Sequence, residues 1–295
     1  MRHIEIVTRD NYKLQGTLFE STTEPKAIFY MVHGMCEHKE RFYKFMEYLS
    51  MHGYTSLLCD LRGHGIDVEK KELGYFGTKE SLINDLEDVI KYIKCSFPYK
   101  KIILFGHSMG SLIVRNYIQN NDAEIDKMIL CGPPTKNVLA PVGSVLSSTI
   151  GIVKGYHYRS KFINGISIGS YNKGFSTPNS WLLLNKDELN KYNNDKFCGF
   201  IFTANGFKTL FYMLNRAYDK SNYKCNNKDI KILVIGGSED RVIVSQKKFN
   251  HLIKFLNKVG YNSVDYQIFN HMRHDILNET NNEKVYEKVL SFINK

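Results

Sequence analysis

The sequence predicts an α/β fold in which helices cover both faces of a mostly parallel sheet. Three observations predict it: short apolar runs alternate with helical patterns, the alternation stops at residue 132, and it resumes at residue 230. Strands that alternate with helices form parallel sheets, because each crossover helix packs back onto the sheet. The 295 residues are 43% hydrophobic and 24% charged, which excludes a disordered chain and suits one or two domains.

Eight segments are expected to be strands. The first two flank a polar turn, and most of the others are short, nearly continuous apolar runs, such as AIFYMVH at 27–33. Runs of this kind are typical of strands that are buried on both faces. In chain order, the expected strands are 4–8, 14–20, 27–33, 55–59, 102–106, 127–131, 230–236 and 264–269.

Five helices are expected between or after these strands. The clearest has Leu82, Leu86 and Val89 on one face, and Thr78 is the expected N-cap of this helix. The expected helices are 39–52, 78–93, 111–119, 245–259 and 283–293.

Residues 132–228 interrupt the alternation, and we expect them to form an insertion in a core made of 1–131 and 229–295. Short helices are expected within it, such as 181–189 and 206–217. Apolar side chains are frequent in this segment, and either a small helical core or a substrate pocket explains them. The run that begins at Trp181 and includes Leu184 could pack, line a tunnel or contact a membrane, so residues near these two are candidates for substrate binding.

The segment Gly106-His107-Ser108-Met109-Gly110 matches the pattern G-x-S-x-G between a predicted strand and a predicted helix. This context is typical of a nucleophile elbow, in which the serine occupies a strained turn at the end of a strand. The glycines remove side chains that would keep the strand and the helix apart. Ser108 is therefore the candidate nucleophile, and the backbone N–H of Met109 is a candidate donor to an oxyanion.

A serine hydroxyl needs a base, and a carboxylate must orient that base. Two predicted strands in the last third of the chain are followed by such residues: GSED begins at 237, and HMRHD begins at 271. The order serine, acid, histidine fits an elbow of this type. Position alone leaves Glu239 and Asp240 open as the acid, and His271 and His274 open as the base.

Two other glycine-containing loops follow predicted strands. In HGMCEH, the backbone N–H of Met35 is the expected second oxyanion donor, and the His33 side chain is expected to hold the loop by hydrogen bonds. In DLRGHG, Asp60 and Arg62 are expected to form a structural ion pair, and His64 is expected to be structural.

Together these segments resemble the monoacylglycerol lipase and lysophospholipase branch of the α/β-hydrolase family, also grouped as serine aminopeptidase-like hydrolases. The matching segments, in order, are HGMCEHKERF at 33–42, DLRGHG at 60–65, GHSMG at 106–110, GSEDRVIV at 237–244 and RHDILNE at 273–279. The resemblance implies an α/β-hydrolase fold with an eight-stranded sheet and a helical cap at 132–228. It places the acid on Asp240 and the base on His274, and Cys36 stands where the family usually has glycine.

The resemblance implies a carboxylic-ester hydrolase that acts through an acyl-enzyme. Ser108 would attack the ester, His274 would transfer the proton, Asp240 would hold the imidazole, and the amides of Met35 and Met109 would bind the oxyanion. No metal and no organic cofactor is implied. The expected substrates are monoacylglycerols, lysophospholipids or similar acyl esters.

Two other classes of function remain open. An aminopeptidase or amidase needs carboxylates that bind the substrate ammonium, and residues 151–228 contain only 4 acidic against 12 basic side chains. A non-catalytic binding protein on this fold typically lacks one of the three catalytic residues, whereas all three are present here. The sequence therefore favours the esterase over both alternatives.

The net charge of +10 is concentrated in one region, since residues 151–228 carry +8 of it. No nucleic-acid recognition motif accompanies this charge, so nucleic acid is not an expected partner. Peripheral contact with an anionic membrane surface and a merely solvated lysine-rich face are the two open interpretations.

The chain is expected to be cytoplasmic, with the membrane surface as a peripheral location. Its first residues lack an apolar leader, and no apolar run is long enough to span a bilayer. The six cysteines include no CxxC pair, so we expect reduced thiols rather than disulfides or a zinc site.

Overall fold

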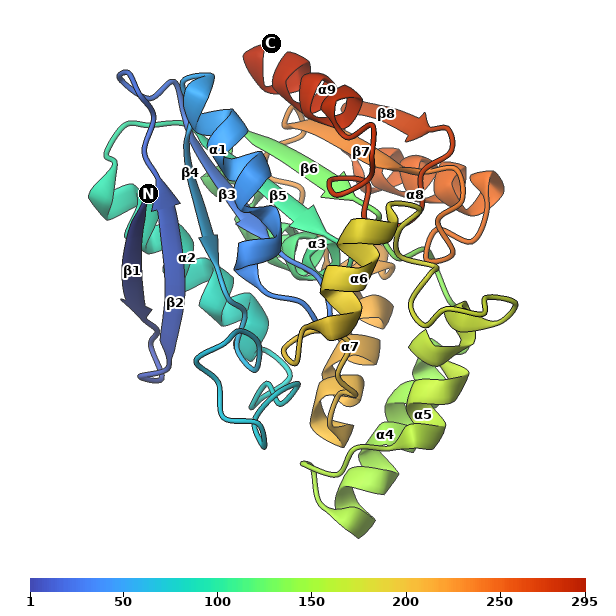
Figure 1. Cartoon of the computed structure of the whole chain (residues 1–295). Coiled ribbons are helices and arrows are strands. Elements are labelled where there is room, and N and C mark those ends of the chain that lie inside the picture. Colours follow the sequence, from blue (N-terminus) through green and yellow to red (C-terminus); the bar gives the residue numbers. More distant parts are fainter.

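The computed structural model describes residues 1–295, and an eight-stranded sheet lies at its centre (Figure 1). The strand order is β1-β2-β4-β3-β5-β6-β7-β8, with antiparallel pairing only at β1–β2 and β2–β4. The predicted mostly parallel α/β sheet is confirmed. Its strands are β1 (Arg2–Val7), β2 (Lys13–Phe19), β3 (Ile28–Val32), β4 (Thr55–Cys59), β5 (Ile102–His107), β6 (Lys127–Cys131), β7 (Lys231–Gly237) and β8 (Ser263–Phe269).

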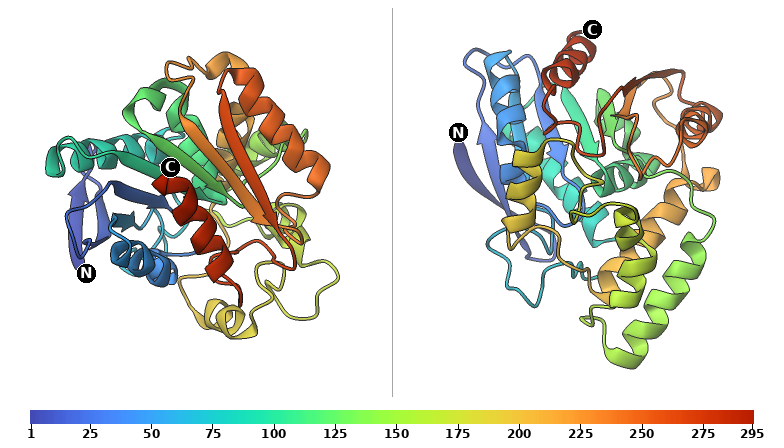
Figure 2. Two further views of the ribbon diagram at one scale, coloured as in Figure 1. Left: turned by 90° about the horizontal axis from the view of Figure 1, so that it is seen from above. Right: turned by 45° about the vertical axis from the view of Figure 1, so that its right-hand side comes forward.

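Helices cover both faces of this sheet, as the left panel of Figure 2 shows. The side chains of β3 alternate between two hydrophobic clusters: Tyr30 faces α2, α3 and α8, whereas Phe29 and Met31 face α1 and α9. This alternation explains the continuous apolar run, because each face of a central strand is buried. The covering helices are α1 (Tyr43–Met51), α2 (Ser81–Ser96), α3 (Met109–Asn121), α8 (Gln246–Val259) and α9 (Glu283–Asn294).

The ends of two core helices show how local signals act. At the start of α8, the Ser245 hydroxyl accepts a hydrogen bond from the Lys248 N–H, and Gly260 ends the helix with φ +133°. The expected cap at Thr78 was wrong. Helix α2 begins three residues later, at Ser81, whose hydroxyl accepts a hydrogen bond from the Thr78 N–H. No side chain caps the first turn of α2, and Glu80 stands at its N-cap position.

Between β6 and β7 the chain forms the insertion, residues 132–228, with four α-helices, of which α4 and α5 extend away from the sheet (Figure 1). Helix α4 packs along α7, and α7 in turn contacts α3 of the core. None of the helices of the structure combines the length and the apolar character that crossing a membrane requires. The helices of the insertion are α4 (Ala140–Lys154), α5 (Lys161–Ile166), α6 (Lys186–Asn194) and α7 (Ala204–Ala217).

Helix α4, the longest of the insertion, was not expected from the sequence. It is rich in glycine and serine, which are weak helix formers in isolation. Its small residues instead permit close packing: a Cβ at Gly143 would lie 2.7 Å from the ring of Phe211. Contact with α7 therefore stabilises a helix that its own residues disfavour.

The helix expected at 181–189 was also displaced. Residues from Trp181 to Leu184 are not helical, and α6 begins at Lys186. The Asn185 side chain caps α6 by accepting from the backbone N–H groups of Asp187 and Glu188. The N–H of Leu184 donates to the distant Glu279 carboxylate, which holds this stretch out of the helix.

Candidate active site

The side chains of Ser108, His274 and Asp240 form a continuous chain of hydrogen bonds at the carboxyl end of the sheet. His274 Nε2 lies 2.7 Å from Ser108 Oγ, and His274 Nδ1 lies 2.9 Å from Asp240 Oδ2. Asp240 also accepts a hydrogen bond of 2.7 Å from the Val242 N–H. Histidine and aspartate are almost completely buried, at 1% and 5% exposure. The arrangement lets the imidazole take a proton from the serine while the carboxylate holds its orientation.

The two alternative residues lie outside this chain. The His271 side chain is 92% exposed, and its Nδ1 is 3.6 Å from a carboxylate oxygen of Glu239. Glu239 also lies 3.7 Å from Arg273 at the surface. Among the acid and base candidates that position left open, the structure brings only Asp240 and His274 to Ser108.

Ser108 occupies a sharp turn between β5 and α3, with φ +50° and ψ −118°. This left-handed conformation is costly for a residue with a side chain and places the hydroxyl at the end of the strand. The packing around the turn tolerates no extra atom, since a Cβ at Gly110 would lie 2.1 Å from the Val32 carbonyl oxygen. The elbow therefore depends on glycine at this position.

Two backbone N–H groups beside Ser108 are free to bind a ligand. Met35 donates no hydrogen bond within the protein, although its neighbours do: Gly34 donates to Glu37, and Cys36 donates to His64. Met109 is the first residue of α3, where an N–H group has no intrahelical acceptor. Both methionines line the same cavity as Ser108.

Histidines hold the loop that carries Met35 (residues 33–38), which we call the oxyanion loop after the role that the sequence leads us to expect for Met35. His33 Nε2 accepts from the Leu61 N–H at 2.9 Å, and His64 Nε2 accepts from the Cys36 N–H at 3.2 Å. Burial lowers the pKa of His64 to about 3, which keeps it neutral and able to accept. Cys36 has φ +56°, a backbone conformation that favours glycine, the residue that the resemblance leads us to expect at this position.

The expected ion pair between Asp60 and Arg62 does not form. Asp60 instead accepts from the Lys39 side chain at 2.5 Å, whereas Arg62 pairs with Asp85 of α2 at 2.7 Å and with Asp10 at 2.8 Å. The two side chains leave the loop in different directions and meet partners that are distant in sequence.

A buried network behind the site was not assigned from the sequence. Glu37 Oε1 lies 2.9 Å from His107 Nδ1 within the elbow, and Glu37 Oε2 lies 3.3 Å from Arg41 Nε. The other end of Arg41 binds Asp275, the neighbour of His274, at 2.5 Å. The network therefore ties the oxyanion loop, the elbow and the histidine loop together. Both Glu37 and Arg41 lie in the segment 33–42 that matches the family, and this match is the sequence feature that could have identified them.

Within this network, charge and burial shift the pKa of each group in opposite directions. Burial alone would raise the pKa of Glu37, but the charges of His107 and Arg41 hold it well below its usual value. Burial would likewise lower the pKa of His107, but the Glu37 carboxylate raises it. The result is a buried ion pair between Glu37 and the elbow residue that precedes Ser108.

Ser108 and His274 face a cavity of about 280 Å³, and 16 of its 29 lining residues are hydrophobic. The insertion contributes much of the wall, including residues 166–172 and the α7 side chains Leu210 and Phe211. Of the two sequence candidates for substrate binding, Trp181 lines the cavity, with its ring 5.4 Å from that of His274. Leu184 is not among the lining residues and is 39% exposed.

The sheet topology, the elbow and the position of the histidine define an α/β-hydrolase fold. A carboxyl esterase from Bacillus coagulans has the same fold, with a TM-score of 0.91 at 21% identity; the alignment covers 99% of this chain and 97% of the esterase.

The family model described as "Serine aminopeptidase, S33" matches residues 23–281, so the chain belongs to this family. A monoglyceride lipase homolog of monkeypox virus is 30% identical over 44% of this chain, and a probable lysophospholipase L2 of Haemophilus influenzae is 26% identical over 39%. These alignments span 49% and 37% of the two relatives.

Proposed function

We propose that this chain is a serine carboxylic-ester hydrolase that cleaves monoacylglycerols, lysophospholipids or similar acyl esters through an acyl-enzyme. One observation carries the proposal: the hydrogen-bonded series of Ser108, His274 and Asp240 faces a mainly apolar cavity. The names of the relatives, a monoglyceride lipase homolog and a probable lysophospholipase, agree with this substrate class.

In the proposed mechanism, His274 removes the proton from Ser108 as the hydroxyl attacks the ester carbonyl. Asp240 stabilises the imidazolium that forms. The amides of Met35 and Met109 donate to the oxyanion, and each such donor contributes about 3 kcal/mol where removal has been measured. His274 then gives its proton to the departing alcohol, and water repeats the sequence to release the acid. The residues present need no metal for this chemistry.

The charges around the cavity favour an ester over a peptide substrate. None of the acidic side chains of 151–228 lines the cavity, so none can bind the ammonium group of a peptide N-terminus there. The one carboxylate among the lining residues, Glu37, already pairs with His107 and Arg41. The apolar walls of the insertion suit an acyl chain, and we therefore propose that residues 132–228 act as a cap.

The proposal is tested by the substitution Ser108→Ala, assayed with p-nitrophenyl esters. We expect turnover to fall by about 10⁴-fold or more, because loss of the nucleophile leaves only the remaining binding contributions. Ser50→Ala is the matched control, since Ser50 is a buried serine in α1, away from the cavity.

Undiminished turnover in the Ser108→Ala protein would exclude the mechanism. A panel of monoacylglycerols, lysophospholipids and aminoacyl anilides then distinguishes the substrate classes. Faster cleavage of the anilides than of the esters would favour the aminopeptidase.

We also propose that the insertion contacts anionic lipid surfaces. The outer side of α4 exposes Val142, Val145 and Ile152 at helical spacing, and Lys154 and Lys161 lie at the ends of α4 and α5. Apolar side chains flanked by lysines suit a membrane interface that carries negative charge. Figure 1 shows both helices projecting away from the sheet.

Flotation with vesicles tests this contact. We expect binding to phosphatidylglycerol-containing vesicles that weakens with salt and with the substitution Val145→Ser, but little binding to phosphatidylcholine alone. If binding is independent of both salt concentration and lipid charge, the lysines of the insertion face solvent and do not bind lipid.

A further inference from the structure

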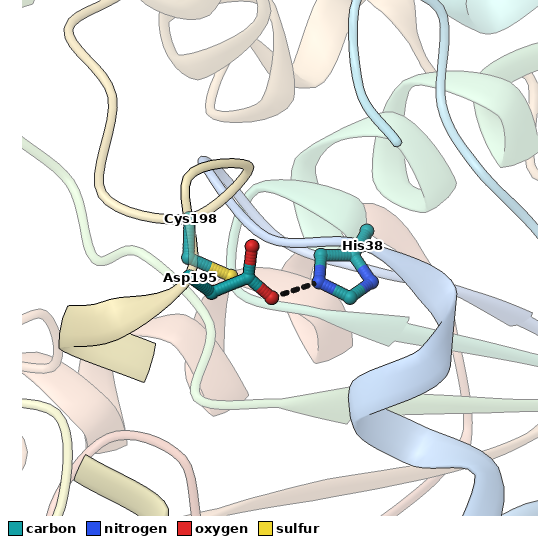
Figure 3. A group of neighbouring side chains, drawn as sticks. All are labelled: His38, Asp195 and Cys198. Atoms are coloured by element: carbon teal, nitrogen blue, oxygen red, sulfur yellow. Dashed lines mark hydrogen bonds and ion pairs between the residues drawn. The ribbon is translucent and has the colours of Figure 1, made fainter. Parts of the chain in front are cut away.

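Three side chains that commonly bind metals meet where the end of the oxyanion loop contacts the insertion (Figure 3). His38 lies at the end of that loop in the core, whereas Asp195 and Cys198 follow α6 in the insertion. One ligand atom from each lies within 4.8 Å of the others, and His38 Nε2 is 2.7 Å from Asp195 Oδ2. His38 and Asp195 are 157 positions apart, so no sequence spacing could predict the cluster.

The second nitrogen of His38 has the partner that metal-bound histidines usually have. His38 Nδ1 hydrogen-bonds to the Glu40 carboxylate, which orients the ring and directs Nε2 toward Asp195 and Cys198. A carboxylate on the far side of a ligating imidazole fixes its tautomer and increases its basicity. His38 and Cys198 are buried, whereas the Asp195 side chain is 31% exposed and leaves an approach from solvent.

We propose that His38, Asp195 and Cys198 bind one Zn²⁺ ion, with water as the fourth ligand. An imidazole nitrogen, a thiolate and a carboxylate form a donor set that suits zinc, whereas Mg²⁺ and Ca²⁺ prefer oxygen ligands. At zinc bond lengths, tetrahedral nitrogen and oxygen ligands lie about 3.3 Å apart. Asp195 must therefore move outward by roughly 0.6 Å from its hydrogen bond with His38, and its partly exposed side chain allows this.

The ion would connect the insertion to the oxyanion loop. The two segments already touch, because the Gly199 N–H donates to the Cys36 carbonyl at 3.0 Å and the Tyr192 hydroxyl donates to the same oxygen at 3.1 Å. Cys36 directly follows Met35. Zinc at this position would thus act as a clasp that holds the insertion against the loop carrying a proposed oxyanion donor. The site itself does not depend on the proposed esterase activity.

Co²⁺ and Zn²⁺ titrations of metal-free protein test the site. We expect one equivalent of Co²⁺ to give the near-ultraviolet charge-transfer band of a cobalt–thiolate bond, and Zn²⁺ to displace it and raise Tm. Cys198→Ala should abolish the band, and Asp195→Asn should weaken Zn²⁺ binding at least tenfold. Cys95→Ala is the matched control, because Cys95 is an exposed thiol outside the cluster, and it should bind like the unaltered protein.

A band of equal strength in the Cys198→Ala protein, or its loss in Cys95→Ala, would overturn the proposal. X-ray absorption at the zinc edge of the unaltered protein gives a second measurement that does not depend on any variant folding. One sulfur ligand among nitrogen and oxygen ligands supports the site. A shell without sulfur, or less than half an equivalent of bound zinc, overturns it.

Discussion

The core and the insertion differ in where they place polar and apolar side chains. Ser108, Asp240 and His274 all follow core strands, in loops whose backbone is held by glycines and buried hydrogen bonds. The insertion instead carries most of the net charge and exposes apolar side chains on α4 and α5. The comparison teaches that the sheet holds the three candidate catalytic residues in place, whereas the helices between β6 and β7 supply much of the cavity wall, where we propose that the substrate is selected.

The largest difference in stability between the two regions is expected when one methyl group is added to a glycine of each. We expect Gly110→Ala to destabilise the protein by about 5 kcal/mol or more, because the new Cβ would lie 2.1 Å from a backbone oxygen of β3. Gly165→Ala in α5 meets nothing within 4 Å and should stabilise by about 0.5 kcal/mol. Chemical denaturation measures both, and equal effects would refute the contrast.

A second comparison concerns the stability that is lost when an ion pair is removed from the core or from the insertion. In the core, this loss should depend on pH. Glu37→Gln leaves His107 without its counter-charge, and we expect a loss of about 3–5 kcal/mol near pH 6. In the folded protein the pKa of His107 is raised and that of Glu37 is lowered, so the pair contributes fully between pH 4.5 and pH 6.5, and its contribution disappears as pH rises through the raised pKa. The loss should therefore be smaller at pH 9.

Urea denaturation at both pH values checks this expectation. Glu188→Gln is the corresponding substitution in the insertion, since Glu188 pairs with Lys191 near the surface. The loss of stability in this protein should stay below about 1 kcal/mol. An unchanged loss for Glu37→Gln between pH 6 and pH 9 would show that the charge of His107 does not matter.

The smallest expected effect concerns selectivity. Leu210→Trp narrows the cavity from the α7 side, and we expect kcat/KM for long-chain esters to fall about tenfold relative to acetate esters. Leu139→Trp is the control, because Leu139 is 66% exposed and does not line the cavity. Equal activities toward all chain lengths in the Leu210→Trp protein would mean that the acyl chain lies elsewhere.

Much of the fold could be predicted because its signals are local. Apolar runs and glycines identified the strands and the elbow around Ser108, and both depend on neighbours in the sequence. The acid could not be chosen from position, because Glu239 and Asp240 are adjacent, and only the turn that directs Asp240 toward the Val242 N–H separates them. The resemblance to known proteins supplied that choice before the geometry did.

The parts that could not be predicted depend on distant partners. Arg62 pairs with Asp85 rather than with its neighbour Asp60 because α2 packs beside the loop. Helix α4 forms because Gly143 admits the ring of Phe211, a contact between residues that the sequence places far apart. The cluster of His38, Asp195 and Cys198 likewise exists only once the insertion lies against the core.

The bond between Arg41 and Asp275 joins positions 234 residues apart, and it has a consequence for the order of folding. Closing so long a loop costs more conformational entropy than closing a local one, and such contacts form late. The oxyanion loop and the elbow can therefore form while the histidine segment is still unattached. A chain emerging from the ribosome would hold its serine without its base, and the proposed activity would arise only when the last strand has docked.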